Sequence, residues 1–286
     1  MQTREQVAHA PVVAAFSPET AARAPVEFAL AASRLTGARV TVVAVTRGPA
    51  HTLEPSTVAR AGWPPALLEL ELELAVRGVP VELLHCKDST PARGLARAID
   101  ALAPELIVLG SSSRGPRGSV LLGATAQRVI NVSACPVALV PGGYRGPAAG
   151  IAVIGAAYTA TPEGEQALRA AAALAHAGAT RLRAIAVADR EQARKELSGA
   201  ITTIAGEAVE IEITPGEPAS GLVRASRRLD LLVMGSRGLG PRRAVILGSV
   251  SRRVVDNAAC PVLVIPRAAA ARRVSRSLRS ASSAPR

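Results

Sequence analysis

Two stretches of this chain repeat each other. Residues 106–137 read LIVLGSSSRGPRGSVLLGATAQRVINVSACPV, and residues 231–262 read LLVMGSRGLGPRRAVILGSVSRRVVDNAACPV. They align without a gap at one offset, with Gly110 over Gly235 and Cys135 over Cys260. Solenoid repeats are much shorter, about 20–50 residues. The repeat therefore indicates two fused copies of one domain, each of about 130–140 residues.

Apolar runs and helix-forming runs alternate in each copy. In the first copy we expect strands at 11–16, 40–45, 79–85, 105–110 and 136–140, and helices at 24–36, 66–77, 91–103 and 123–132. In the second copy we expect strands at 151–157, 182–188, 209–214, 230–235 and 261–265, and helices at 162–177, 191–205, 218–228 and 248–257. Residues 47–65 are interpreted as a loop that the second copy largely lacks.

The stretch 66–77 is ambiguous, because leucine and glutamate alternate in it as they would in a strand. We favour a helix, since the stretch is long, consists of strong helix formers and stops at Gly78. Its glutamates, among them Glu73, are expected to face solvent.

Strands that are apolar throughout and separated by helices predict a parallel sheet covered on both faces. The expected fold is α/β, with two tandem doubly wound domains, each an open five-stranded parallel sheet flanked by helices. We place the domains at 8–141 and 149–266, followed by a disordered Arg/Ser-rich tail at 267–286. Ligands of such folds bind at the carboxyl ends of the strands, where the strand order reverses.

The formal net charge is +12, and half of this excess comes from the six arginines of the tail. The tail could make nonspecific contacts with anions, either nucleic acid or lipid, although a solvated end is the simpler interpretation. Three cysteines without a CxxC motif indicate buried free thiols in a reducing compartment. Since no signal peptide and no membrane-spanning run is visible, we expect a cytoplasmic protein.

The loop at 235–249, GSRGLGPRRAVILGS, carries the chemistry of the second copy. Its glycines, which allow close approach of a ligand, are Gly235, Gly238, Gly240 and Gly248. Its arginines are Arg237, Arg242 and Arg243. Gly248-Ser249 opens a helix whose first N–H groups have no partner within the helix. These features predict an anion cradle of the phosphate-binding type, and the structural alternative is a tight connection with arginines facing water.

The spacing Gly235-x2-Gly238-x9-Gly248-Ser249 resembles the G-x2-G-x9-G-[ST] ATP-binding motif of the universal stress protein family, whose members bind ATP, bind AMP or bind no nucleotide. The ending SRRVVDNAACPVLVIP and the duplicated order of elements are also similar to tandem members of that family. The resemblance implies an adenine nucleotide alpha hydrolase-like fold, with the two domains paired through edge strands as a pseudo-dimer. It also implies a role in stress tolerance, and a dimer of two such chains would fit the family.

Site residues follow from this resemblance by position. Phosphates and ribose would be held by Gly235, Gly238, Gly248 and Ser249. The backbone of Val187 would meet the adenine, and Met234 and Val250 would flank the nucleotide. Weaker candidates are Thr159, Arg237, and Gly110 and Gly123 of the first copy. The cofactor would be ATP or AMP; the sequence requires no metal, although Mg²⁺ is compatible with ATP.

Both copies depart from the family pattern. The family's first strand usually ends in an aspartate that reaches the nucleoside, but Ala15 replaces it in the first copy and Thr159 is its nearest match in the second. Such a lost hydrogen bond is worth roughly 1–3 kcal/mol, about one to two decades of affinity. The first copy also has Ser113 and Ala124 where the motif needs glycine and a hydroxyl. The second copy is therefore the expected nucleotide site.

Other activities find little support in the residues. His85 and Cys86 are adjacent on an expected strand and point to opposite faces, and no Cys/His pair has zinc spacing. No GxSxG motif and no catalytic base is evident, so we expect no enzyme beyond slow ATP hydrolysis. We predict a stress-response regulatory or protective module that binds an adenine nucleotide. The alternatives are a nucleotide-free scaffold for protein partners and a basic protein associated with nucleic acid or membrane.

Overall fold

The computed structural model describes residues 10–49, 53–55, 62–112, 118–133, 135–236 and 247–266. The first half contains β1 (Val12–Phe16), α1 (Ala24–Thr36), β2 (Val40–Arg47), β3 (Glu54–Pro55), α2 (Pro65–Val76), β4 (Val81–Asp88), α3 (Pro91–Leu102), β5 (Leu106–Gly110), α4 (Ala124–Val132) and β6 (Val137–Val140). The second half contains β7 (Val153–Ala157), α5 (Pro162–Gly178), β8 (Arg181–Val187), α6 (Glu191–Ala205), β9 (Glu210–Thr214), α7 (Pro218–Ser226), β10 (Leu231–Gly235), α8 (Ser249–Asn257) and β11 (Val262–Ile265).

The expected helices are all present, with ends that differ from the prediction by no more than two residues. The ambiguous stretch is helical, because α2 buries Leu67, Leu70 and Leu74 on one face and leaves Leu72 exposed. Two expectations for the strands were wrong. β4 begins and ends later than 79–85, and the expected loop contains β3, which pairs antiparallel with the edge strand β4.

The described strands form one sheet in the order β3-β4-β2-β1-β5-β6-β11-β10-β7-β8-β9. Within each half the parallel strands run third, second, first, fourth, fifth, as a doubly wound fold requires. The halves join where β6 and β11 pair antiparallel, with Leu139 opposite Val262. The tandem domains therefore share a continuous sheet, which confirms the predicted pseudo-dimer.

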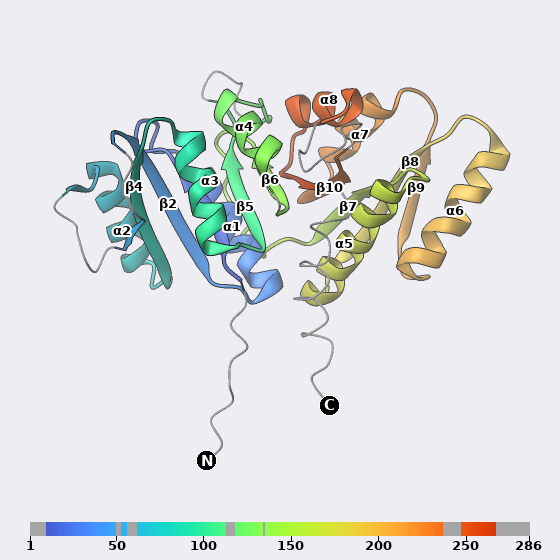
Figure 1. Ribbon diagram of the computed structural model, residues 1–286. Helices are drawn as coiled ribbons and strands as arrows, with labels where there is room; N and C mark the ends of the chain where they lie inside the picture. Colours follow the sequence, from blue (N-terminus) through green and yellow to red (C-terminus); the bar gives the residue numbers. More distant parts are fainter. Residues whose placement is uncertain are drawn as a thin grey trace, which may run out of the picture.

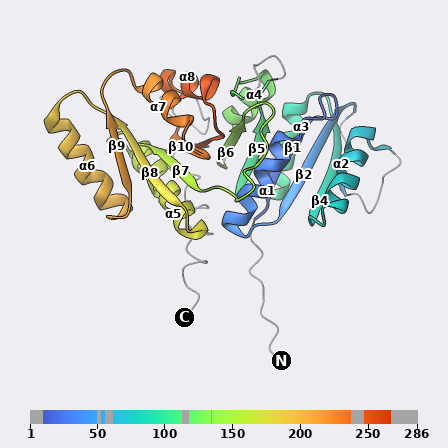
Figure 2. The same ribbon diagram turned by 180° about the vertical axis from the view of Figure 1, so that it is seen from behind.

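Helices cover both faces of this sheet (Figures 1 and 2). Residues of α1, α2, α5 and α6 contribute to one buried apolar cluster, and residues of α3, α4, α7 and α8 contribute to the other. Successive residues of β1 divide between the two, with Val12 and Ala14 in the first cluster and Val13 in the second. Strands buried on both faces explain why the runs that predicted them are apolar throughout.

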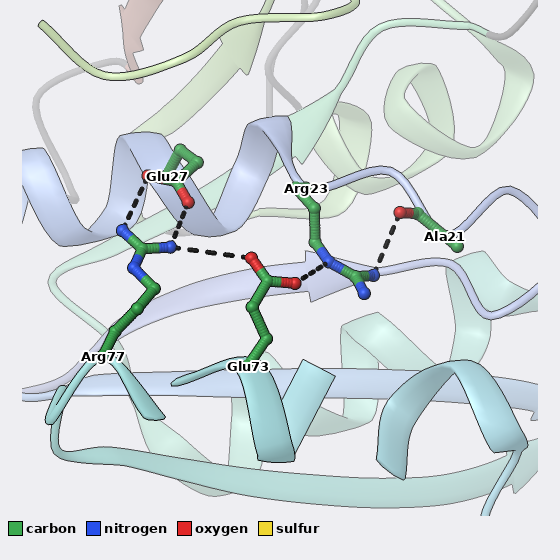
Figure 3. A network of polar contacts seen from close by, with 5 residues as sticks. All are labelled: Ala21, Arg23, Glu27, Glu73 and Arg77. Atoms are coloured by element: carbon green, nitrogen blue, oxygen red, sulfur yellow. Dashed lines mark hydrogen bonds and ion pairs between the residues drawn. The ribbon is translucent and has the colours of Figure 1, made fainter. Parts of the chain in front are cut away.

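Four charged side chains tie α2 to α1 and to the turn before it (Figure 3). Glu73 accepts a hydrogen bond from Arg23 Nε at 2.7 Å and lies 3.7 Å from Arg77, which also binds Glu27. Glu73 was expected to face solvent alone, but it bridges two helices. The sequence could not show this, since Arg23 is 50 residues away.

Candidate functional site

The strand order reverses between β7 and β10 in the second half. The chain runs outward from β7 through β8 to β9 and then returns to β10 on the other side of β7. The carboxyl ends of β7 and β10 therefore flank the crevice where this fold class binds ligands. Among the predicted site residues, Thr159 follows β7, Val187 ends β8, Met234 and Gly235 end β10, and Gly248, Ser249 and Val250 begin α8.

The backbone of Val187 projects beyond the β7–β8 ladder. The last pair in that ladder joins Ala157 to Ile185, whereas Val187 is still paired with Thr214 of β9. The carbonyl of Ile185 accepts from Tyr158 N toward β7, and Ala188 N donates to β9. Because alternate residues of a strand direct their backbone groups to opposite sides, the N–H and C=O of Val187 point toward the β7 side. The structure thus places this backbone edge at the crevice.

Gly235 lies at the end of β10 against the first turn of α5. A Cβ added to Gly235 would lie 2.7 Å from the carbonyl oxygen of Glu163. Gly110, its counterpart, is less crowded, since an added Cβ would lie 3.2 Å from Pro25 Cγ. The packing of strand against helix therefore explains the glycine at 235 without a ligand, and its predicted contact with phosphate stays a prediction.

Helix α8 starts at the crevice without a capping side chain. Gly248 is its N-cap in an extended conformation, with φ −65° and ψ 168°, and no side chain accepts a hydrogen bond there. By contrast, Thr161 caps α5 and Glu217 caps α7. Ser249 is exposed in the first turn. The hydroxyl of Ser251 donates to the carbonyl of Gly235 at 3.3 Å, which holds the start of α8 beside β10.

Three of the predicted residues have surroundings that the sequence did not reveal. The side chain of Met234 is buried in the apolar cluster beneath α7 and α8, and Val250 packs partly against the same cluster. The hydroxyl of Thr159 lies 3.2 Å from that of Thr161, so Thr159 folds onto the start of α5. No carboxylate takes the place of the family's aspartate directly after β7 in the described chain.

Two predicted residues, Arg237 and Gly238, lie outside the described residues, as do Gly240, Arg242 and Arg243. Ser113 of the first half also lies outside them. Nowhere in the described ranges do three or more His, Cys, Asp or Glu side chains gather as a metal would require. No helix within those ranges is long and apolar enough to cross a membrane.

The corresponding loop of the first half is closed by hydrogen bonds. Leu121 N donates to Ser111 Oγ at 2.6 Å, and Ser112 N donates to the carbonyl of Leu121 at 2.8 Å. Gly123, the N-cap of α4, lies close to Ser112, since an added Cβ would lie 3.4 Å from Ser112 Cβ. The N–H groups of Ser112 and Leu121 are therefore already used within the loop.

The same loop is also bound to the second half. Val120 N donates to the carbonyl of Ala258 at 3.0 Å, and Leu122 N donates to Asp256 Oδ1 at 3.1 Å. Beside them Arg252 of α8 donates to Gln127 of α4 at 2.6 Å. The antiparallel pairing of β6 with β11 forms the seam between the two halves. Figure 1 shows α4 and α8 next to each other above this seam. These contacts could not be predicted from the sequence, because each joins segments more than 120 residues apart.

Two doubly wound α/β units joined through antiparallel edge strands define the fold class of this chain. The sequence profile of the universal stress protein family matches residues 10–141 and 151–266. The chain belongs to the universal stress protein family, as a member with two tandem domains.

Known relatives extend over both halves. A universal stress protein of Mycobacterium tuberculosis is 26% identical over 271 residues, covering 78% of this chain and 93% of the relative. A putative universal stress protein of Pseudomonas aeruginosa has a TM-score of 0.66 at 16% identity, covering 96% of this chain and 98% of that one. A universal stress protein of Archaeoglobus fulgidus has a TM-score of 0.60 at 18% identity, covering 90% and 98%. At these identities the two structures show the fold alone.

Proposed function

We propose that the second half binds an adenine nucleotide, ATP or AMP, and that the protein acts as a stress-response regulatory or protective module. The observation that carries this proposal is the start of α8. A helix that begins at the crevice with Gly248 and Ser249, and without a capping side chain, directs its first N–H groups at any bound anion. The phosphates would lie there.

The other end of the nucleotide would lie at β8. The backbone N–H and C=O of Val187 point toward the crevice, and a donor and an acceptor in that arrangement match the edge of an adenine ring. Met234 would contribute through its backbone position, since its side chain is buried. Mg²⁺ bound to ATP would add to the phosphate site, but the residues described here do not form a site for the metal itself.

Affinity is expected to be modest, because no carboxylate follows β7. The Thr159 hydroxyl is the nearest substitute, and it is shared with Thr161. The proposed role is binding, since none of the described residues that border the crevice is placed as a catalytic base. We also propose a cytoplasmic location, because the three cysteines are buried free thiols, as expected in a reducing compartment.

A thermal-shift titration with ATP, AMP and GTP tests the proposal. At 100 times the dissociation constant, a specific ligand stabilises the folded state by about 2.7 kcal/mol, which is several degrees for a chain of this size. We expect adenine nucleotides to give a saturating shift that the Gly248→Val/Ser249→Ala variant loses. A Gly123→Val variant is the matched control in the first half and should keep the shift.

The closed loop of the first half favours a second candidate, a nucleotide-free scaffold that acts through protein partners. In that case both loops would be structural elements of the seam. The absence of any shift at millimolar nucleotide would refute the nucleotide site and leave the scaffold. Pairing of two whole chains is a further proposal, which sedimentation velocity would test.

A further inference from the structure

A basic groove lies between α7 and α8, which are neighbours on one face of the sheet (Figures 1 and 2). It forms an open hollow of about 430 Å³, a volume within the usual range of small-molecule sites. Its polar lining consists of Ser220, Arg224, Arg227, Arg253 and Asn257. The groove follows the length of α7 and meets α8 one turn or more beyond Ser249, so it is separate from the proposed nucleotide site.

The positive charge of this groove is only partly neutralised. Nη1 of Arg253 lies 3.1 Å from Glu217 Oε1, a carboxylate that also caps α7. Within the described part of the chain, no carboxylate lies within 4.0 Å of Arg224 or Arg227, and both side chains are exposed. Three guanidinium groups therefore face one carboxylate.

In the first half, an arginine of the corresponding helix pair, α3 and α4, has a carboxylate partner that neutralises its charge. α3 and α7 align at Pro91 and Pro218, so Arg97 corresponds to Arg224. Arg97 forms an ion pair at 3.2 Å with Asp88, whose side chain is buried. The residue at the position of Asp88 in the second half is Pro215, which cannot form such a pair.

A second position changes in the same direction. Asp100 of α3 corresponds to Arg227 after α7, so an acid in the first half is replaced by a base in the second. The second-half groove thus has as many arginines as its counterpart but one carboxylate fewer, because Ser220 stands in place of Arg93 and Glu217 in place of Thr90. This asymmetry indicates that an anion from outside the chain completes the groove.

Arginine forks match phosphate oxygens, and several of them on two helices suit a ligand with more than one phosphate. None of the described residues that line the groove is aromatic, so it offers no platform on which a base could stack. We propose that the groove between α7 and α8 binds an oligophosphate, recognised through its phosphate groups by Arg224, Arg227 and Arg253.

Calorimetric titration of the full chain with inorganic tripolyphosphate, at about 0.15 M salt to screen weak surface attraction, tests this proposal. The Arg224→Gln/Arg227→Gln variant should weaken binding by about tenfold or more. Both side chains are exposed and glutamine is a good helix former, so the variant should fold and keep its melting temperature.

A matched control removes the same charge elsewhere. Arg190→Gln/Lys195→Gln changes two exposed cations at α6, on the opposite face of the sheet, and should bind tripolyphosphate as the unmodified chain does. The Gly248→Val/Ser249→Ala variant should also keep the binding, which separates the groove from the proposed nucleotide site. These results would support the groove whether or not the protein binds ATP.

Three outcomes would overturn the proposal. Equal weakening in the groove variant and the α6 control would show that only net charge matters. Loss of binding in the Gly248→Val/Ser249→Ala variant alone would place the anion at the start of α8. Tighter binding of a glutamate-rich peptide of equal charge than of tripolyphosphate would show that the groove recognises an acidic protein segment instead.

Discussion

The two halves of this chain share a strand order but differ where the fourth helix begins. In the first half, Ser111, Ser112 and Leu121 close the loop with internal hydrogen bonds, and Val120 and Leu122 bind the other half. In the second half, α8 begins at the crevice with the exposed Ser249, where α4 has Ala124, and neither helix start has a capping side chain. If the second half binds a nucleotide as proposed, one copy of the duplicated loop belongs to the seam and the other serves the ligand.

Helix α8 takes part in both functions. Its first turn would hold phosphate, while Asp256 in its last turn holds the loop of the first half. The first half thus supports the helix on which the proposed site depends. Because both halves belong to one chain, this loop and α8 are always present together.

The largest effect on stability should come from an alanine at Gly235, which ends β10, compared with the same change at Gly110, which ends β5. Gly235→Ala would force a Cβ against the carbonyl of Glu163, and we expect it to destabilise the chain by about 1–3 kcal/mol. Gly110→Ala meets only the ring of Pro25 at 3.2 Å and should cost about 1 kcal/mol or less. Urea unfolding of both variants measures the difference, and equal losses would contradict the packing account.

A smaller loss of stability should follow from removing the hydrogen bond that joins Asp256 of the second half to Leu122 of the first. Asp256→Ala removes the acceptor for Leu122 N and the partner of Arg252, so we expect a loss of about 1–2 kcal/mol. Hydrogen exchange at Leu122 should become faster. Glu165→Ala, which removes an exposed pair with Arg169, is the control and should leave that exchange unchanged.

The next comparison removes the serine hydroxyl at the start of α8 and adds one at the start of α4. Ser249→Ala should weaken ATP binding about five- to tenfold, the effect of one lost hydrogen bond. Ala124→Ser should create no new site, because the N–H groups of Ser112 and Leu121 in the described part of that loop are already hydrogen-bonded. A second binding event in the Ala124→Ser variant would show that the closed loop does not exclude nucleotide.

The smallest effect concerns Asp88 at low pH. Burial opposes its ionisation, but hydrogen bonds from Arg97 and Ser89 prevail and lower its pKa. The folded state then binds its proton less readily than the unfolded state, so stability is lost as the pH falls below the ordinary value of 3.8 toward the lowered one. Melting temperatures of Asp88→Asn should fall less steeply with acid, whereas Asp100→Asn on the exposed side of α3 should follow the unmodified chain.

Local signals predicted most of the fold. Alternating apolar and helix-forming runs located the helices that the structure confirms, and Gly78 was correctly interpreted as the residue that stops α2. The strand β3 was missed, because two residues paired with an edge strand carry no periodicity of their own. The seam contacts of Asp256 were also missed, since sequence spacing carries no information about a partner 134 residues away.

The candidate site was predicted less completely. The motif located the crevice and the start of α8, because glycine and serine at a helix start have a direct physical meaning. It could not distinguish a glycine needed for a ligand from one needed for packing, as at Gly235. It also did not show that the side chain of Met234 is buried. An apolar residue at a strand end produces the same sequence pattern whether its side chain faces the core or the ligand.

The number of ATP molecules bound per chain tests the asymmetry most directly. Isothermal titration of the full chain should give one site, which Gly248→Val abolishes and Gly123→Val preserves. Two sites per chain, or a single site that Gly123→Val abolishes, would contradict the assignment of the nucleotide site to the second half.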